Sequence, residues 1–572
     1  MKNYKKVYAA FILAGGLILH GCNGIFDDLA INPNQPSMGA YFTSPSAVND
    51  AVMTMYGYMS TQRCLGASGS KTTIIRSDEA SSNSDYGKPG MFGADLNASY
   101  YTIEQPYTLM YTTASQASYI IETAPSVDFS GNEEMRNAYM GEAYFWRAFA
   151  HYYLLINFRN ISPIRQMPRN GDDYVRPLEK PAAVWDFIQE DLAHAKELLP
   201  VKGYWDSKNA GRVTKASAAA LLGKAYLYRS GIEQYYGEDK TTFYSEAAKE
   251  FGDVIDGKYG TYDLTKNYAD NFDVAHENNE ESILEFQFLG DVDNAGFNPG
   301  LATSGLAFDS RGLMLPGAGV GYEGVVHNWL YNAFVNSVDK DGYTDIRMFS
   351  TMIFNDLDAS IHLRNDAGGN PVRLEGPGGY KWEELYPAKN GKEGFATVSN
   401  PLAHSFKAGI RKGIDCSMPT QTEADGTPKL VGVGAGVKEY VYNQPRAHGV
   451  NWRYIRYADV LMMYAESVVS GGTPASNMTP LQAVNKVRGR ANMSELPSVT
   501  MADIQNERIL EFALEGHRFY DLLRWGKLAS RFTELQESDP NFKKFISADD
   551  FKGFVTNKHE WLPIPINEVN SN

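Results

Sequence analysis

Cysteine is scarce in this chain of 572 residues, which limits both disulfide formation and metal binding. Only three cysteines occur, Cys22, Cys64 and Cys416. None belongs to a Cys-x-x-Cys pair or lies near a cluster of histidines, so a thiolate metal site is not expected. The sequence leaves open whether Cys64 and Cys416 pair in an oxidising compartment. We expect neither a metal nor a cofactor.

Positive charge is also in short supply. The chain has 53 Lys and Arg against 68 Asp and Glu, a net charge of −15. Because nucleic acids and anionic lipids recruit proteins through basic surfaces, neither is an expected partner. Beyond residue 22 no segment has 18 uninterrupted apolar residues, so we expect no membrane-spanning helix there.

Common catalytic motifs are missing as well. The chain has no His-Glu-x-x-His, no Gly-x-Ser-x-Gly and no Glu-x-x-His pair. The segment 66–72 departs from a phosphate-binding loop, because Leu65 stands where the first glycine belongs and Ser70 replaces the glycine before Lys71. Glycosidase acids have no reliable short motif, so a surface glycoside hydrolase stays as an alternative. We predict that the protein is not an enzyme.

The first 22 residues have the pattern of an export signal. Three lysines precede an apolar run over 7–19, which is too short to span a bilayer. Cys22 follows the small residue Gly21, as at the cleavage and acylation site of a bacterial lipoprotein, although His20 departs from the small residue usual there. We predict a signal peptide over 1–21 and a lipid on Cys22. The alternative is an ordinary signal peptide in which this cysteine is incidental.

Cleavage after the signal would make the protein more acidic. Residues 1–21 contain three Lys and no acid, so 50 basic and 68 acidic residues would remain, a net charge of −18. Residues 22–37 are predicted to form a tether, because their Asn-Gly pair, two prolines and further asparagines favour turns and solvated backbone. The rest, 38–572, is predicted to be one globular domain.

Helical periodicity is clear in four stretches. They cover Met140–Phe158, Pro181–Leu199, Thr214–Tyr228 and Tyr244–Ile255. Small residues beside large aromatics recur in them and suit close helix contacts. Helix pairs at intervals of roughly 30–40 residues suggest tetratricopeptide-like units. From periodicity alone, an unrelated helix bundle is equally compatible.

The domain is expected to have three parts. A helical part covers about 38–257, a loop-rich part about 258–451, and a second helical part about 452–572. Gly, Asn, Asp and Pro are frequent in the middle part, where 290–324 and 365–394 are predicted to be long loops. Loops of that length inside a compact protein often carry a binding surface.

Ordered motifs in the last part of the chain resemble the signature of the SusD/RagB family. They are, in order, Arg456–Glu466, Ala483–Ala491, Glu507-Arg508, Glu511–Gly526 and Leu562–Pro565. Gly141–Ala148 is similar to the family's N-terminal helix motif. Asp27-Asp28, soon after the cysteine, loosely matches the surface-export signal of Bacteroidetes lipoproteins. The resemblance spans the predicted mature chain, strongly at its C-terminal end and weakly in the middle.

This resemblance implies a fold, a function and a partner. SusD-like proteins are mainly α, with four tetratricopeptide-like helix pairs in a right-handed scaffold that supports a large loop-rich ligand face. They are lipid-anchored at the outer-membrane surface, where they capture oligosaccharide or polysaccharide without catalysis. They cover a SusC-like TonB-dependent transporter that takes up the nutrient. The same family also allows a subunit of an importer whose cargo is peptide.

A capping box at Thr500 and Asp503 predicts the start of a helix in the charged C-terminal block. We expect this helix to run through Glu515 and to end at the following glycine. On such a helix acids four residues apart would stack, and Arg508 would reach Glu511.

The charges of this block suit a structural network better than a catalytic pair. A glycosidase also needs two neighbouring carboxylates, but three arginines here would neutralise the acids. The charged residues are Glu507, Arg508, Glu511, Glu515, Arg518 and Arg524. We expect buried ion pairs, and we expect His517 to be a hydrogen-bonded packing residue rather than a base.

A sugar-binding site should be found among aromatic residues in loops. A neutral sugar offers hydroxyl groups and an apolar ring face, which suit flat aromatic side chains beside a few polar groups. The ligand candidates are Asp78, Asp85, Tyr86, Phe92, Tyr100 and Tyr101 in one region, and Phe308, Arg311, Tyr322 and Trp329 in another. Each aromatic taken singly is more often a packing residue. Trp329 could also start a helix through Val335 and belong to the core.

The predicted anchor can be tested directly. Cys22→Ala should abolish lipid labelling and release the protein from membranes without changing its fold, because each buried acyl methylene contributes about 0.8 kcal/mol of membrane affinity. Labelling with a fatty-acid probe followed by fractionation measures this, with Cys416→Ala as the matched control. Lipid labelling that persists in Cys22→Ala would contradict the lipoprotein assignment.

Overall fold

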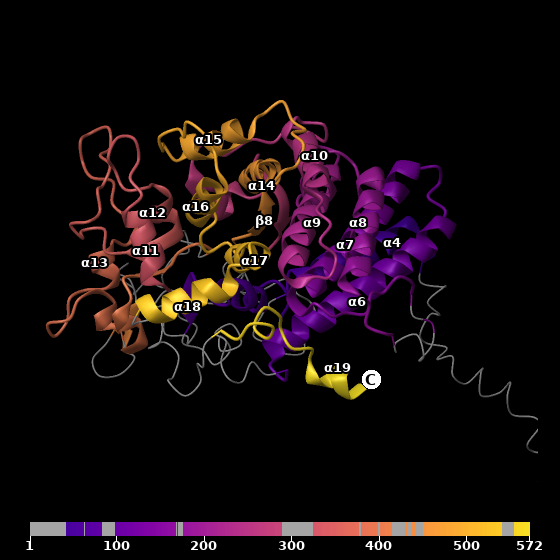
Figure 1. The fold of residues 1–572 in the computed structure, drawn as a ribbon, viewed down its shortest axis with the longest axis horizontal. Helices are drawn as coiled ribbons and strands as arrows, with labels where there is room; N and C mark the ends of the chain where they lie inside the picture. The colour runs from indigo at the N-terminus through magenta and orange to yellow at the C-terminus, as the bar shows by residue number, and fades with distance from the viewer. Residues whose placement is uncertain are drawn as a thin grey trace, which may run out of the picture.

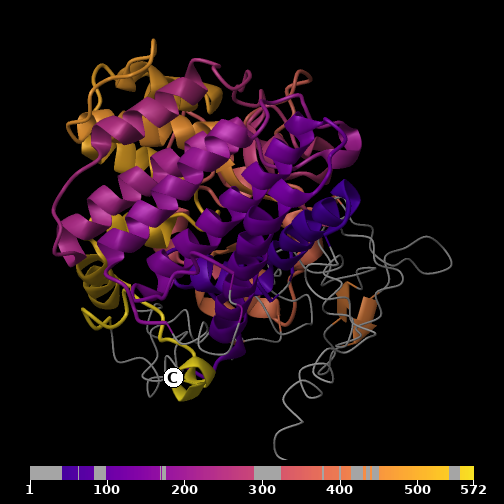
Figure 2. The same ribbon diagram turned by 90° about the vertical axis from the view of Figure 1, so that its right-hand side faces the viewer.

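A row of packed helices forms the main body of the structure (Figure 1). The computed structural model describes residues 42–61, 63–82, 98–167, 169, 176–288, 324–376, 379–398, 401–413, 430–432, 438–440, 450–539 and 554–571. The row begins with α4 (Pro45–Met59), α6 (Tyr101–Thr123), α7 (Glu133–Phe158), α8 (Pro181–Leu198), α9 (Lys215–Tyr236) and α10 (Tyr244–Ile255). Each of these helices packs against the next, and Figure 2 shows them side by side in indigo and magenta.

The row continues with helices from the far end of the chain. α10 packs against α14 (Tyr457–Val469), which packs against α15 (Pro480–Arg490). Gly252 lets α10 approach the connection between α14 and α15, because a Cβ there would lie 2.2 Å from the carbonyl oxygen of Ala475. The chain between α10 and α14 is therefore an insertion into a continuous helical row. The loop-rich part expected from the sequence, about 258–451, falls within this stretch.

Further helices complete the C-terminal part and the connections. They are α16 (Met501–Glu511), α17 (Arg518–Arg524), α18 (Leu528–Ser538) and α19 (Ile566–Ser571), with α5 (Ala67–Ser70) and the π-helical turn η1 (Lys71–Ile75) between α4 and α6. α17 packs against both α9 and η1, so C-terminal residues reach the N-terminal half.

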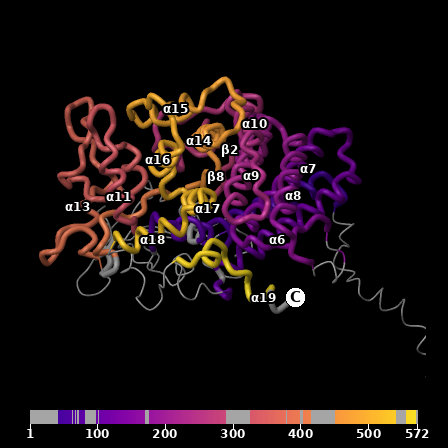
Figure 3. The backbone as a smooth tube through the Cα atoms, in the orientation of Figure 1, coloured from indigo at the N-terminus to yellow at the C-terminus, as the bar shows by residue number. Residues whose placement is uncertain are grey.

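The insertion has a hydrophobic core of its own. It contains the short helices α11 (Asn328–Val335), α12 (Arg347–Thr351) and α13 (Trp382–Leu385). A four-stranded antiparallel sheet has the order β1 (Ala80–Ser82), β3 (Gly324–Val326), β5 (Ala408–Ile410) and β4 (Met352–Phe354). Figure 3 shows α11 and α13 of the insertion on one side of α16 and α17, with α9, α8 and α7 on the other side. Ile74 and Ile75 from the N-terminal half, and Ala513 and Leu514 from the C-terminal part, help to build this second core.

A strand pair closes the insertion where it rejoins the row. β2 (Ser282–Phe286) and β8 (Trp452–Arg456) pair antiparallel, with Phe286 opposite Trp452. Both of these aromatic side chains lie in the core of the helical row. A further pair, β6 (Leu430–Gly432) and β7 (Lys438–Tyr440), lies within the insertion.

The sequence predictions for the helices are largely confirmed. α8 and α10 lie where periodicity placed them, and α11 starts beside Trp329 as expected. α7 ends at the expected Phe158 but begins at Glu133, before the expected Met140. α9 continues beyond the expected Tyr228 because Gly231, which could have ended it, is packed inside the helix against α17. The predicted loop over 365–394 is not wholly irregular, since it contains α13.

Some expectations fall on parts that the structure does not describe. The predicted signal peptide, Cys22 and the tether precede the first described residue, and Cys416 lies in another undescribed segment. Cys64 is buried in the core of the helical row. Within the described residues, none of the helices combines the length and apolar character needed to cross a bilayer.

Two helical glycines give a matched test of the packing. A Cβ at Gly231 would lie 2.5 Å from the backbone oxygen of Arg524, whereas a Cβ at Gly57 meets nothing within 4 Å. Gly231→Ala should therefore lower the free energy of unfolding by about 1–3 kcal/mol. Gly57→Ala should raise it by about 0.4–1 kcal/mol, because alanine restricts the unfolded chain. Urea denaturation measures both, and equal effects of the two substitutions would contradict the close contact between α9 and α17.

Candidate functional site

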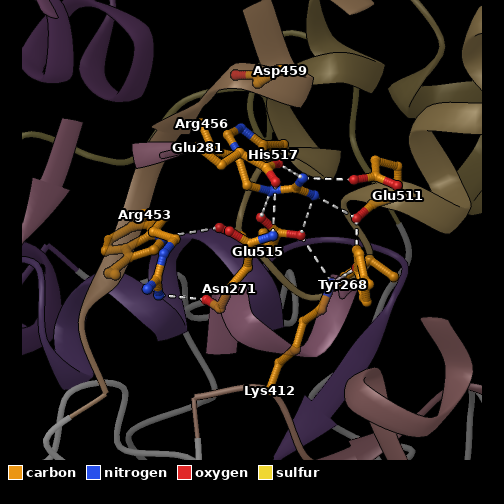
Figure 4. A network of polar contacts seen from close by, with 12 residues as sticks. Tyr268, Asn271, Glu281, Lys412, Arg453, Arg456, Asp459, Glu511, Glu515 and His517 are labelled. Carbon is orange, nitrogen blue, oxygen red and sulfur yellow. Dashed lines mark hydrogen bonds and ion pairs between the residues drawn. The ribbon is translucent and has the colours of Figure 1, made fainter. Parts of the chain in front are cut away.

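The charged C-terminal block forms a buried network around Arg456 (Figure 4). Its guanidinium donates to Glu281 at 2.6 Å, to Glu511 at 2.6 Å and to both oxygens of Glu515 at 2.9 Å. Arg456 and these carboxylates are at most 1% exposed. A buried charge is tolerated only when it is paired and hydrogen-bonded, and here one cation joins three acids from separate parts of the chain.

Other basic residues balance the remaining acid charge. Arg347 donates to Glu507 at 2.5 Å and to Glu511 at 3.0 Å, and Lys412 donates to Glu515 at 2.9 Å. The network contains the cations Arg347, Lys412, Arg456, Arg488 and Arg490 and the carboxylates Asp345, Glu281, Glu507, Glu511 and Glu515. Equal numbers of each sign leave the cluster neutral.

The helix that carries these acids ends earlier than the sequence predicts. The capping box at Thr500 and Asp503 is present, but α16 stops at Glu511 instead of Glu515. Leu514 has φ 61° and Gly516 has φ 90°, so the chain turns sharply between the two acids. The expected stacking of Glu511 on Glu515 along one helix is therefore wrong.

The partners expected for two residues of this block need correction. Arg508 does not reach Glu511; it donates to Asp459 at 2.8 Å and to Asp521 at 2.7 Å. His517 is buried with Nδ1 at 3.4 Å from Nζ of Lys224. Burial, together with the Lys224 charge, lowers the pKa of His517 to about 3, so the imidazole is neutral at pH 7. Its predicted role as a packing residue agrees with this position.

The network lacks the properties of a catalytic pair. Burial alone would raise the pKa of Glu515, but Arg456 and Lys412 hold it at about 2. The pKa of Glu511 is lowered as well, because Arg490, Arg456 and Arg347 outweigh its burial. Carboxylates that stay ionised cannot act as general acids at neutral pH, and these have no exposed surface to offer a substrate.

The two aromatic-rich regions predicted from the sequence adjoin the same strand pair: one follows β1, and the other precedes β3. β1 and β3 pair with Ser82 opposite Gly324. Ser82 is the last described residue before 83–97, and Gly324 is the first after 289–323. The two candidate segments are therefore anchored at neighbouring positions of one sheet, although they lie far apart in the sequence.

A polar cluster surrounds this strand pair, and we call it the loop root. It consists of Asp78, Glu79, Ser81, His327, Trp329, Arg518 and Arg531. Within it, His327 joins the two strands. Its Nδ1 lies 2.9 Å from the carbonyl oxygen of Asp78, which can only accept, so Nδ1 carries the proton and donates. Burial lowers the pKa of His327, so Nε2 is unprotonated and accepts from the Ser81 hydroxyl at 2.6 Å.

Asp78 connects the loop root to the C-terminal helices. Its carboxylate accepts from Arg518 at 2.9 and 3.0 Å and from Arg531 at 2.7 Å. Burial opposes ionisation, but the two guanidiniums hold the pKa of Asp78 below its ordinary value. Because Asp78 is 0% exposed and its two oxygens are occupied, the prediction that it contacts a ligand does not agree with the structure.

Glu79 is held in the opposite protonation state. Burial raises the pKa of this carboxyl group to about 8, so it is mostly neutral at pH 7. It accepts from the backbone N–H of Leu514 at 2.9 Å, in the turn that follows α16. Its own carbonyl oxygen accepts from the N–H of His327 at 2.9 Å. The loop root and the Arg456 network are therefore tied together through this turn.

Two aromatic candidates lie in described positions near the loop root. Trp329, in the first turn of α11, is half-buried and donates from Nε1 to the carbonyl oxygen of Asp78 at 2.5 Å. The guanidiniums of Arg531 and Arg518 lie 4.2 and 5.4 Å from its ring centre, so packing occupies much of this side chain. Tyr100 is half-buried at the N-cap of α6 and packs against the core.

The remaining candidates cannot be placed. Tyr101 starts α6, but its side chain lies outside the described part. Asp85, Tyr86, Phe92, Phe308, Arg311 and Tyr322 lie outside the described residues. They stay predictions, now with their segments anchored at the loop root.

Sequence reasoning missed several residues that hold this region together. Arg347 and Lys412 lie in the irregular middle of the chain, where no periodic pattern marks them as buried. His327 and Arg531 likewise belong to no motif singled out. Among the cations of the two clusters, those that carried a usable signal are in the C-terminal motifs: Arg456, Arg488, Arg490 and Arg518.

Family comparisons agree with this architecture. A model described as the SusD family matches residues 421–572, and one described as "Starch-binding associating with outer membrane" matches residues 31–227. The chain belongs to the SusD/RagB family. A SusD-like protein of Bacteroides ovatus is 25% identical over 533 residues, covering 92% of this chain and 83% of that protein.

Solved structures confirm the fold. A SusD superfamily protein from Bacteroides vulgatus has a TM-score of 0.67 and 22% identity, covering 93% of this chain and 98% of that one. Surface glycan-binding protein A from Bacteroides thetaiotaomicron, solved with laminarihexaose, has a TM-score of 0.66 and 19% identity, covering 92% and 98%. The mainly-α, tetratricopeptide-like scaffold is thereby confirmed over the unrelated helix bundle.

The network predicts a specific loss of stability. Glu511→Gln keeps the side-chain shape but leaves three arginines short of a charge, so the free energy of unfolding at pH 7 should fall by about 3–5 kcal/mol. The exposed Glu537→Gln on α18 is the control and should change it by no more than about 0.5 kcal/mol.

The same pair of variants tests the electrostatic origin. Because the pKa of folded Glu511 lies below its ordinary 4.5, its contribution is fully present above that pH and is lost as the pH falls below it. The stability gap between wild type and Glu511→Gln should therefore narrow in acid. Urea denaturation between pH 7 and pH 3 measures this, and a constant gap would show that packing rather than charge is responsible.

Proposed function

We propose that this protein captures oligosaccharide or polysaccharide at the cell surface without catalysis and delivers it to a SusC-like TonB-dependent outer-membrane transporter for nutrient uptake. The observation that carries the proposal is the pairing of Ser82 with Gly324, which anchors two aromatic-rich segments at one place. A glycan longer than one sugar needs several flat contacts, and two segments on a common anchor can supply them.

The chemistry around this anchor favours a neutral ligand. Arg518 and Arg531 are both paired with Asp78, and Arg531 also pairs with Glu534 at 3.0 Å, so two carboxylates balance the two guanidiniums. Arg76, a possible contact for a charged ligand, is buried, with its guanidinium 3.9 Å from the ring centre of Phe519. A structural neighbour solved with laminarihexaose supports a glycan as the class of ligand.

The surface location is part of the same proposal. The predicted lipid on Cys22 would hold the protein to the outer membrane, and the description of the matching N-terminal family model associates that family with this membrane. The SusC-like partner follows from family membership alone.

A binding panel tests the proposal. Laminarin, soluble starch, xylan and galactomannan are run as affinity gels, together with a peptide mixture in titration calorimetry, and each mixture is then analysed for products. We expect retention by at least one polysaccharide with no cleavage. Binding of peptides alone would favour a peptide importer, and released sugars would reveal a glycoside hydrolase.

Aromatic variants then test where the glycan binds. Tyr86→Ala and Tyr322→Ala should each weaken binding about tenfold or more, equal to about 1.4 kcal/mol, at unchanged melting temperature. Trp329→Ala should lower the melting temperature because this side chain packs under two arginines. The exposed Tyr235→Ala on α9 is the matched control and should bind normally.

Salt dependence distinguishes stacking from charge. Binding through aromatic faces should change little between low and moderate salt, since screening acts on charges. Normal binding by all the loop variants, or a collapse of binding with salt, would contradict the proposed site.

A further inference from the structure

A small pocket lies beside the connection between α8 and α9. It has a volume of about 250 Å³, and its lining includes Lys202, Trp205, Asp206, Arg212, Tyr262 and Asn278. Ligand sites for drug-sized molecules usually exceed about 300 Å³, so this pocket suits one sugar ring better than a long segment.

An indole forms a fixed wall of the pocket. Trp205 is half-buried and donates from Nε1 to the carbonyl oxygen of Val213 at 3.1 Å. The guanidinium of Arg212 lies 4.1 Å from its ring centre and so covers one face of the indole, which leaves at most the other face for a ligand. This guanidinium is itself held by both oxygens of Glu142 at 2.8 and 2.5 Å. The platform is thus positioned by a buried ion pair before any ligand arrives, which lowers the entropic cost of binding.

Polar groups beside the indole are still available. The hydrogen bonds that Asp206 accepts all go to Oδ1, and within the described residues neither its Oδ2 nor the Ser207 hydroxyl has a protein partner. The ammonium nitrogen of Lys202 lies 3.9 Å from the ring centre of Tyr262 and donates to the carbonyl oxygen of Thr261 at 3.1 Å. An ammonium has three donors, so further hydrogen bonds to a ligand remain possible.

The charges of the lining cancel. Lys202 and Arg212 face Asp206 and Glu285, two residues of each sign. An anion or a cation would therefore gain little net attraction, whereas a neutral polyol could use the free donors and acceptors and stack its ring on the indole. These are the requirements that the sequence analysis set for a sugar site.

The pocket and the loop root lie at opposite ends of α9. Arg212 and Thr214 precede the first residue of α9, whereas Glu233 near its other end pairs with Arg159 at the end of α7. Asn157, in the last turn of α7, accepts from Arg76, two residues before Asp78. α9 has 22 residues and is therefore about 33 Å long, so the pocket and the contact of Glu233 with Arg159 lie about one helix length apart.

We propose that this pocket is a second binding site for neutral saccharide, separate from the aromatic segments at the loop root. The class of ligand rests on the proposed function, whereas the pocket itself does not. A polysaccharide bound at one site would meet the other at high effective concentration, so the two sites together would hold long chains better than short ones.

Two variants test the pocket by different routes. Trp205→Ala removes the platform, and Ala210→Arg places a long side chain at an exposed position of the lining without touching the indole. Lys208→Ala, on the same loop but outside the lining, is the matched control. Each variant is compared with wild type on laminarin, starch, xylan and galactomannan affinity gels, and with laminarihexaose and maltohexaose in calorimetry.

We expect Trp205→Ala and Ala210→Arg to weaken retention by a polysaccharide about tenfold or more, while Lys208→Ala binds as wild type. Residual polysaccharide binding by Tyr86→Ala/Tyr322→Ala should disappear when Trp205→Ala is added. If Trp205→Ala lowers the melting temperature, its weaker binding could come from misfolding, and the retention of Ala210→Arg is then the measurement that tests the site.

Normal retention of Ala210→Arg on every polysaccharide that wild type binds would overturn the second site and leave the proposed function intact. Failure of wild type to bind any of the glycans would overturn both.

Discussion

The structure depends on one buried guanidinium. Arg456, directly before α14, holds Glu281 from the start of the insertion and Glu511 and Glu515 from the C-terminal part. Removing these charges from water costs several kcal/mol per ion, and the cost is offset only when all partners are in place. Arg456 therefore ties the helical row, the insertion and the C-terminal part together, and removing any one partner would leave a buried charge unpaired.

α16 ends at Glu511, and the chain turns before it reaches Glu515. Glu515 therefore contacts Arg456 from this turn rather than from the helix. The turn through Leu514 and Gly516 brings them together, and the same turn donates a backbone N–H to Glu79 of the loop root. Arg518, just beyond it, reaches Asp78. One short segment thus sets both the central network and the anchor of the candidate loops.

Local patterns in the sequence predicted much of the fold. α8, α10 and the C-terminal end of α7 follow from periodicity. The end of α16 could not be predicted, because long-range ion pairs override the helical preference of its last residues. Two contributors to the network, Arg347 and Lys412, have no periodic signal, since the glutamates that they pair with lie far away in the chain. The candidate segments were predicted from their composition. That they adjoin the same strand pair could be seen only in the structure, from the pairing of β1 with β3.

The family signature identifies the scaffold and not the ligand, because its charged residues are structural. The motif residues Arg456, Glu511, Glu515, Arg518 and Asp521 are all buried, so they fix how the chain folds and where the loops begin. The network residues named above all lie outside segments 83–97 and 289–323, which contain Tyr86 and Tyr322. Changes in those segments can therefore alter the ligand without unpairing a buried charge. A scaffold built in this way can keep its fold at low sequence identity while its binding face changes.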